Sequence, residues 1–454
     1  MGMVKAGFAQ TDITPRVGVE MTGFGPYILR QSTGVRDRLW AKAMVLELDG
    51  ERMLLIACDL LGVSLDFTNM VRAKIEAHTG ISKDAIMLAC SHTHSGPAVS
   101  YYIGWGERDL FYAEILPVLL VQAAIQAVGN LAEVTFAHAE IPCEGIGINR
   151  EYDQHCVAPE IALVEGWTPD RPELTDTTCH VITARAGEKL VGFFSYFSCH
   201  PVSCCEKSYL LHGDYCGVAS NCVGDEYDGA IGLFLQGALG DVNACVAHES
   251  QDMSLQALDV LAGRYARALR EGVEQAEPFL VDRIACFSES VTFSRRAWSL
   301  ADLKAKLKEA EDIIGAVPND MCSSADLHRD HKRALSVVFA NALRGIIDRM
   351  ERDGSHIPPT ELQGMAIGKV SILGSGFEVF QQIKREINAQ AESTVPLVTG
   401  LVNDSTGYAP DRETADRGGY AVDQVPLMGG QIPYSNIHDE LVEALLRIDT
   451  ALQP

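Results

Sequence analysis

Short apolar runs alternate with glycine-rich and polar segments along most of the chain, a pattern typical of an α/β protein. Two of these runs flank the turn Asp49-Gly50 and predict a pair of strands, at 41–48 and 52–58. Further runs predict strands at 84–90, 189–197, 232–236, 363–373 and 395–402. Amphipathic or longer apolar stretches predict helices at 65–78, 115–128, 255–275, 299–314, 324–352 and 378–388.

The middle of the chain, residues 251–352, reads as a charged, amphipathic helical block. Ser299 followed by Asp302 is a typical N-cap pattern, which places the start of one of its helices. A length of 454 residues could hold two or three domains. Because no stretch resembles a linker and no internal repeat is found, we interpret residues 1–454 as one domain whose helical block is peripheral. The Gly-, Asp- and Arg-rich stretch 405–430 predicts a long functional loop.

Side chains capable of chemistry follow directly after three of the predicted strands. His92 and His94 come after one apolar run, His200 after the next, and Asp241 after a third. Such strand ends frequently carry the active site in α/β folds. On an extended strand His92 and His94 would point to the same face, so both imidazoles could bind one metal ion or one substrate. An isolated pair of this kind is as consistent with a polar surface strand as with a binding site. Here, however, a buried apolar run leads into the pair, and Ser95-Gly96-Pro97 ends the strand sharply.

Two further residues are ambiguous when taken singly. His200 could be a satisfied core residue, and Glu378 could be a carboxylate favoured by the dipole of a helix N-terminus. His200 nevertheless falls within a series of motifs that share one order along the chain. The motifs are Asp12-Ile13-Thr14-Pro15 with Gly23, His92-Thr93-His94-Ser95-Gly96-Pro97, Ile148-Asn149-Arg150, His200-Pro201, Asp214-Tyr215-Cys216-Gly217 and Gly240-Asp241-Val242. With these motifs the sequence resembles the neutral (alkaline, non-lysosomal) ceramidase family over nearly its whole length, and the HTHSGP motif is the most specific of them.

The resemblance implies a mixed-sheet α/β catalytic domain with helical insertions and one zinc site. The zinc ligands that it implies are His92, His200, Glu378 and Tyr408. Histidine nitrogen and carboxylate oxygen are usual zinc donors, whereas a tyrosine ligand is uncommon and rests on the resemblance alone. The catalytic residues that it implies are Tyr420, which faces the reacting carbonyl, His94, which transfers a proton or polarises the substrate, and the active-site arginine, Arg150.

The sequence departs from the family at Asn243, where ceramidases carry a serine that is implicated in catalysis. An amide side chain cannot replace a hydroxyl as a nucleophile. The resemblance therefore transfers the fold and the metal site more readily than ceramide as the substrate. Asn243 would donate a hydrogen bond to substrate or water instead. Since the sequence ends at Pro454, we also expect it to lack the β-sandwich domain that follows the catalytic part of ceramidases.

The mechanism that these residues favour uses zinc to lower the pKa of a bound water from about 15.7 toward about 7, so that hydroxide attacks a carbonyl carbon. Tyr420, with His94 or Arg150, would stabilise the oxyanion, and His94 would shuttle the proton because imidazole titrates near neutral pH. The leading hypothesis is a zinc-dependent hydrolase of a linear amide bond in a small or lipid-like molecule. One alternative is an ester or lactone hydrolase with the same site. The other is a non-catalytic metal-binding protein on the same scaffold, against which the retained Tyr408, Tyr420 and Arg150 argue.

Composition restricts the partners and the location. A net charge of -24 and a pI near 4.9 argue against nucleic acid as a partner, and the 47% of hydrophobic residues indicates a globular chain. No apolar run approaches the roughly 20 residues of a membrane span, and the start of the chain lacks a signal-peptide core. The longest run, 115–128, contains Pro117 and predicts a buried helix. Thirteen scattered cysteines, an odd number, predict reduced thiols and a cytoplasmic location; the oligomeric state is not indicated.

Overall fold

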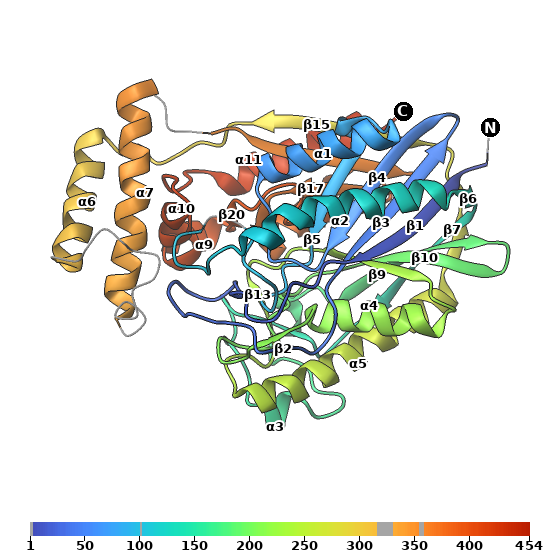
Figure 1. Cartoon of the computed structure of the whole chain (residues 1–454), viewed down its shortest axis with the longest axis horizontal. Helices are drawn as coiled ribbons and strands as arrows, with labels where there is room; N and C mark the ends of the chain where they lie inside the picture. Colours follow the sequence, from blue (N-terminus) through green and yellow to red (C-terminus); the bar gives the residue numbers. More distant parts are fainter. Residues whose placement is uncertain (1–2, 100–101, 316–329, 354–357) are drawn as a thin grey trace.

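Three mixed β-sheets form the frame of the molecule (Figure 1). The computed structural model describes residues 3–99, 102–315, 330–353 and 358–454. The first sheet has the order β5-β4-β3-β1-β6: β5 (Ile86–Cys90), β4 (Glu51–Cys58), β3 (Trp40–Leu48), β1 (Lys5–Asp12) and β6 (Ala132–Glu133). The second has the order β12-β10-β9-β7-β14: β12 (Ile231–Gln236), β10 (Lys189–Phe197), β9 (Thr178–Ala186), β7 (Thr135–Pro142) and β14 (Glu277–Phe279). The third has the order β15-β16-β17-β19: β15 (Ile284–Val291), β16 (Thr360–Ile367), β17 (Val370–Ser375) and β19 (Val395–Thr399).

Each sheet ends in one parallel strand pair, β4 with β5, β10 with β12, and β17 with β19, while its other neighbours are antiparallel. One face of every sheet packs into a common central core, to which Phe8, Phe194 and Met365 each contribute from a different sheet. Strands that are buried on both faces read as continuous apolar runs, and β5 is buried at every position. This arrangement confirms the mixed-sheet α/β fold that the sequence predicts.

The outer face of each sheet is covered by its own pair of helices. On the first sheet these are α1 (Leu65–Thr79) and α2 (Leu110–Gly129), on the second α4 (Asp214–Glu226) and α5 (Gln251–Gln275), and on the third α8 (Gln381–Gln390) and α11 (Ile437–Leu452). Each helix pair shares a separate apolar cluster with its sheet. Burial of these apolar faces is the main contribution that stabilises the three layers.

Shorter elements complete the chain around the sheet ends. Three two-stranded pairs join β2 (Gly34–Val35) to β11 (Leu210–Leu211), β8 (Gly147–Asn149) to β13 (Val242–Ala244), and β18 (Phe377–Val379) to β20 (Gly407–Ala409). The short helices are α3 (Pro159–Ala162), α9 (Arg412–Arg417) and α10 (Val425–Met428). Helices α6 (Leu300–Ile314) and α7 (His331–Asp353) form a hairpin at one end of the molecule and pack against α10 (Figure 1).

Of the described helices, α2 alone is long and apolar enough to cross a membrane by length and composition. This is weak evidence, because core helices pass the same test and α2 buries Leu116, Leu120 and Ala124 against the first sheet. The buried helix predicted at 115–128 lies within α2, which buries the face that packs on the sheet and exposes Val118 on the other face.

Several sequence predictions match the structure closely. The strand pair around Asp49-Gly50 is β3 with β4, and the helix after it is α1. Ser299 caps α6 through a capping box in which it exchanges hydrogen bonds with Asp302. The helix expected at 324–352 is α7, which begins at His331; positions 324–329 lie outside the described residues.

Other predictions are corrected by the structure. The strand expected at 363–373 is a hairpin of β16 and β17 that turns at Gly368, and the strand expected at 395–402 ends at Thr399. Glu378 does not open a helix, because it lies in β18 and α8 begins only at Gln381. The stretch 405–430 is not one loop but carries β20, α9, a single π-helical turn and α10.

Candidate metal centre

Loops that leave two of the sheets meet the β18–β20 pair at one place. The loop after β5 carries His92 and His94, and the loop after β10 carries His200. The prediction that His92 and His94 lie on a strand is wrong: β5 ends at Cys90, and His92 has a left-handed backbone with φ of 66°. A side chain rarely adopts this conformation unless its surroundings impose it, and such positions concentrate at functional sites. Here the His92 N–H donates to the Leu60 carbonyl at 2.9 Å.

The imidazoles of His92 and His200 and the carboxylate of Glu378 converge on one point. Nε2 of His200 lies 3.0 Å from Oε2 of Glu378, and Nε2 of His92 lies 3.6 Å from the same oxygen. The opposite nitrogens, Nδ1, each lie 2.7 Å from a backbone carbonyl, that of Leu61 for His92 and that of Leu239 for His200. If Nδ1 carries the proton and donates to the carbonyl, the lone pair of Nε2 faces Glu378 in both rings.

The charge states of these groups suit a metal ion. Burial, together with the charge of Arg150, lowers the pKa of His200 to about 4, so its imidazole is neutral near pH 7. Burial alone would raise the pKa of Glu378, but the nearby His92 and His200 outweigh it and hold that pKa well below its usual range. Neutral imidazole and ionised carboxylate are the forms in which these side chains bind metals.

The donor set fits zinc by an independent test. Within the described part of the chain, the buried atoms Nε2 of His200 and Oε2 of Glu378 have no hydrogen bond of normal geometry. Donors bound to a tetrahedral zinc ion at about 2.0–2.2 Å are about 3.3 Å apart, a value that the 3.0 and 3.6 Å separations bracket. His94 also belongs to the cluster, since ligand atoms of His92, His94 and His200 lie within 4.8 Å of one another.

Two tyrosines and one arginine border the three converging groups. Tyr408 faces Glu378 across the register of the parallel pair β18–β20. Its hydroxyl accepts a hydrogen bond from Nη2 of Arg150 at 2.9 Å. The ring of Tyr420 lies 6.0 Å from that of Tyr408, centroid to centroid, and the Tyr420 side chain is half exposed. The structure therefore places both tyrosines and Arg150 beside the candidate metal ligands.

Asn243 lies behind Arg150. Its amide oxygen accepts a hydrogen bond from Nη1 of Arg150 at 3.1 Å, and its amide nitrogen donates to the His155 carbonyl at 3.2 Å. Asn243 is buried, and one of its hydrogen-bonding atoms is committed to Arg150. The geometry thus favours a positioning role for Asn243 over the direct contact with substrate that the sequence suggests.

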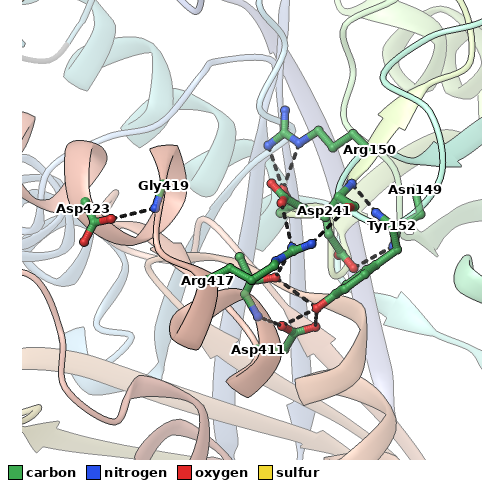
Figure 2. Close-up of polar contacts among 11 residues, drawn as sticks. Asn149, Arg150, Tyr152, Asp241, Asp411, Arg417, Gly419 and Asp423 are labelled. Atoms are coloured by element: carbon green, nitrogen blue, oxygen red, sulfur yellow. Dashed lines mark hydrogen bonds and ion pairs between the residues drawn. The ribbon is translucent and has the colours of Figure 1, made fainter.

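A second polar network connects the Arg150 segment to the chain between the two tyrosines (Figure 2). Asn149 donates to Asp241 at 2.9 Å, and the Tyr152 hydroxyl donates to the carboxylate of Asp411 at 2.7 Å. Arg417, near the end of α9, lies over the ring of Tyr152 at 4.8 Å. These contacts hold the segment that carries Tyr420 against the segment that carries Arg150.

His94 is buried like the other two histidines of the cluster, and the chain passes directly over its ring. Neither ring nitrogen has a hydrogen-bond partner among the residues that the structure describes. Burial, followed by the charges of His92 and His200, lowers the pKa of His94 well below the usual range. Gly23 has φ of 121°, and a Cβ there would lie 2.5 Å from Cγ of His94, so only glycine lets the chain pass over this ring. Behind it, buried Arg30 donates to the His94 carbonyl at 2.9 Å.

The cluster opens into a cleft of about 770 Å³, a volume that includes its mouth. Polar groups, including His92, His94 and Glu378, line its base. The apolar side chains that line it are Leu61, Trp105, Val425 and Met428. Clefts of a few hundred Å³ with a few polar groups in an apolar lining are typical of sites for small organic ligands.

The structure brings all eight residues singled out in the sequence to this one region. The sequence did not reveal the carbonyls of Leu61 and Leu239, because every residue has a carbonyl and only the fold selects these two. Arg30 and the apolar residues that line the cleft belong to none of the sequence motifs either. Gly23 was visible only as part of the motif series, and its contact with His94 could not be read from the sequence.

The fold and the cluster define a mixed-sheet α/β protein with a candidate histidine and carboxylate metal centre. The chain belongs to the neutral/alkaline non-lysosomal ceramidase family, whose N-terminal profile matches residues 4–257.

Known relatives agree with this membership. The chain is 26% identical to a neutral ceramidase of Pseudomonas aeruginosa over 226 residues, which cover 47% of this chain and 32% of the relative. It is 25% identical to a neutral ceramidase of Mycobacterium tuberculosis over 237 residues, which cover 48% and 35%. The matched regions thus span about a third of the length of these relatives.

Solved structures show the same fold. The crystal structure of neutral ceramidase from Pseudomonas aeruginosa superposes with a TM-score of 0.73 at 18% identity, and the match covers all of this chain and 75% of that one. A ceramidase complexed with C2 gives the same TM-score, with coverage of 99% and 75%.

Proposed function

We propose that this protein is a zinc-dependent hydrolase that cleaves a linear amide bond in a small or lipid-like molecule other than ceramide itself. The observation that carries the proposal is the convergence of His92, His200 and Glu378 on one point at the base of a cleft. Membership of a family named for ceramidases, whose substrate is an amide, supports the bond type. Asn243 in place of the family's serine supports a substrate or route that differs from theirs.

His92, His200, Glu378 and Tyr408 would hold the zinc ion. When bound, zinc supplies Lewis-acid chemistry and lowers the pKa of water. The chain's own contribution is orientation, because the carbonyls of Leu61 and Leu239 fix both rings by their Nδ1 atoms. Such pre-organisation keeps the donor atoms in place without reorganisation during the reaction.

Tyr420 and Arg150 are suited to stabilise negative charge on the substrate oxygen. Although the Tyr420 side chain is half exposed, desolvation by the groups around its hydroxyl, together with the charge of Glu378, raises its pKa, so the hydroxyl keeps its proton and can donate a hydrogen bond. Removing one such donor typically lowers the rate by about 10² to 10³. His94 is neutral because of its lowered pKa, which makes it a weak base near pH 7 but leaves it one ring N–H to donate. We therefore propose that it polarises the substrate by a hydrogen bond, and that the role as a proton shuttle expected from the sequence is the less favoured one.

The cleft lining supports an apolar group on the substrate. Trp105, Val425 and Met428 offer apolar surface beside the polar base, which suits an acyl chain or an apolar amine. We also propose a cytoplasmic location, a proposal supported by the unpaired state of the described cysteines.

A substrate panel tests the proposal. Purified protein is incubated with N-acyl amides of increasing chain length and with matched esters and lactones, with and without a zinc chelator, and products are quantified by mass spectrometry. We expect amide cleavage that chelation abolishes and zinc restores. His92→Ala should remove activity and about one zinc per chain. His438→Ala, which disrupts a buried histidine–glutamate pair elsewhere, serves as the matched control and should keep both. Turnover of esters or lactones alone would contradict the amide assignment, and no turnover at all would favour a binding protein.

A further inference from the structure

A second cluster of metal-binding side chains lies on the sheet formed by β7 and β9. His138 and Glu140 are two residues apart on β7, so they share one face of the sheet, and Glu140 is paired with His180 on β9. Nε2 of His138 lies 3.1 Å from Nδ1 of His180, and that atom lies 3.8 Å from Oε1 of Glu140. None of these residues lines the candidate active-site cleft. The two strands lie on the side of the molecule opposite the α6–α7 hairpin (Figure 1).

The spacing of the three donors suits a transition metal. All three ligand atoms lie within 4.8 Å of one another. Since nitrogens on a tetrahedral zinc ion are about 3.3 Å apart, the 3.1 Å between His138 and His180 needs only a small adjustment. The side chain of Glu140 is 57% exposed, so its carboxylate is free to rotate toward the two rings. Both histidines are buried and held by neighbouring strands, which limits the entropy lost on binding.

An additional oxygen donor is available from the next strand. Glu277 on β14 is paired with His138 in the antiparallel register, and paired residues place their side chains on the same face of a sheet. Glu277 is exposed at this position, like Glu140. A set of two imidazoles and one or two carboxylates is a usual zinc-binding combination.

The neighbouring charges and the types of donor atom determine which metal ions the cluster can bind. Lys369 and Lys384 oppose a cation, but Lys384 is paired with Asp176 at 2.6 Å, and Glu140 contributes a further negative charge. With two imidazoles and one carboxylate the cluster has few oxygen donors, which disfavours calcium and magnesium, since these ions need several oxygen ligands. The donor set suits the metals for which imidazole is a preferred ligand, namely zinc, copper and nickel.

We propose that His138, Glu140 and His180 form a second metal site, selective for zinc or a similar imidazole-preferring divalent ion and separate from the candidate active site. The site needs no contribution from His92, His200 or Glu378. It is therefore independent of the proposed hydrolase function.

Metal titration of the apoprotein tests this site. Chelated protein is titrated with Zn²⁺ against a chromophoric competitor, and the titration is repeated with Co²⁺, whose visible absorption reports the ligand field. The wild type should bind two equivalents, and His92→Ala should keep the one at His138. The variant with His138→Asn and His180→Asn should lose that equivalent while keeping amide hydrolysis. Two equivalents in this folded double variant, or a single wild-type equivalent that disappears in His92→Ala, would overturn the proposal.

Single substitutions on the surface test the second site even if the double variant misfolds. Glu140→Ala changes only an exposed carboxylate and should weaken the second equivalent about tenfold or more without affecting the first. Glu188→Ala removes the same charge from the β9–β10 turn of the same sheet, and it should titrate like the wild type. Identical titration curves for Glu140→Ala and Glu188→Ala would overturn the participation of Glu140. One equivalent that depends on His180 and not on His92 would support the second site and contradict the proposed hydrolase ligands.

Discussion

Replacing Asn243 by alanine tests how the family's serine position works in this chain. In the structure the Asn243 amide joins Nη1 of Arg150, at 3.1 Å, to the carbonyl of His155, at 3.2 Å. The alanine variant removes both hydrogen bonds and leaves the candidate zinc ligands untouched. It therefore separates the positioning of Arg150 from metal binding.

The expected loss of activity follows from the hydrogen bonds that Arg150 keeps in the variant. A hydrogen bond to a charged group contributes about 1.5 to 3 kcal/mol. In the variant Arg150 still donates to the Gly240 carbonyl, at 3.1 and 2.6 Å, and to the Tyr408 hydroxyl, at 2.9 Å. We therefore expect the lower end of the range, about 1.5 kcal/mol. Because about 1.4 kcal/mol corresponds to a factor of ten in rate, kcat/KM should fall about tenfold.

The assay compares kcat, KM and zinc content of the wild type, Asn243→Ala and Asn243→Ser. Asn243→Ser restores an acceptor for Arg150 and should recover part of the loss. Zinc content should be the same in all three proteins, and intact-protein mass spectrometry during turnover should find no acyl-enzyme in the wild type or Asn243→Ala. An acyl-enzyme trapped on the wild type would refute the water-dependent route, and full activity of Asn243→Ala would refute the positioning role.

Four further predictions use other parts of the structure. Tyr408→Phe should lower zinc retention, measured by dialysis against a chelator. Tyr420→Phe should keep zinc and lower kcat at least as much as Asn243→Ala does. Equal zinc retention in the two variants would contradict the assignment of Tyr408 as a zinc ligand. Gly23→Ala combines a left-handed backbone with a Cβ 2.5 Å from His94, so it should lower stability by about 1 to 3 kcal/mol in thermal melts; an unchanged Tm would show that the ring can move. The pKa of Glu386 is lowered to about 2 by hydrogen bonds from Arg412 and His438, so its contribution to stability is complete above about pH 4.5 and is lost as the pH falls toward 2. Urea unfolding curves should therefore show a weaker acid dependence for Glu386→Gln. Thiol titration in denaturant without reductant should find most of the 13 cysteines free, and a majority in disulfides would overturn the cytoplasmic location.

The sequence predicted well those elements that extend over many residues and whose structure is specified by neighbouring residues. The β3–β4 hairpin has a turn dipeptide between two apolar runs, and α6 begins with its own capping box, so neighbouring residues specify both. Glu378 shows the opposite case. Its strand is only three residues long and exists because it pairs with Gly407–Ala409, about thirty positions later, while the residues after it favour a helix.

The candidate site was predictable in its residues but not in its geometry. The resemblance carried by the motif series is enough to assign His92, His200, Glu378 and the two tyrosines to one site. The alternation of side chains along a strand predicted that His92 and His94 would point the same way, but for the wrong reason. Both residues lie in a loop, and the left-handed backbone of His92 sets the direction of its ring. That turn depends on contacts with other segments, which no local pattern encodes.

The outer wall of the cleft comes from parts of the chain that belong to none of the three sheets. Trp105 lies in the connection before α2, and Val425 and Met428 lie in the short helix α10, whereas His92 and His200 follow strands of the central frame. Substitutions in the wall consequently change few contacts of the sheets that position the polar base. Under the proposed function, substrate preference can therefore be changed through these few side chains without altering the candidate metal ligands, and libraries of variants at Trp105 and Met428 are the natural starting point.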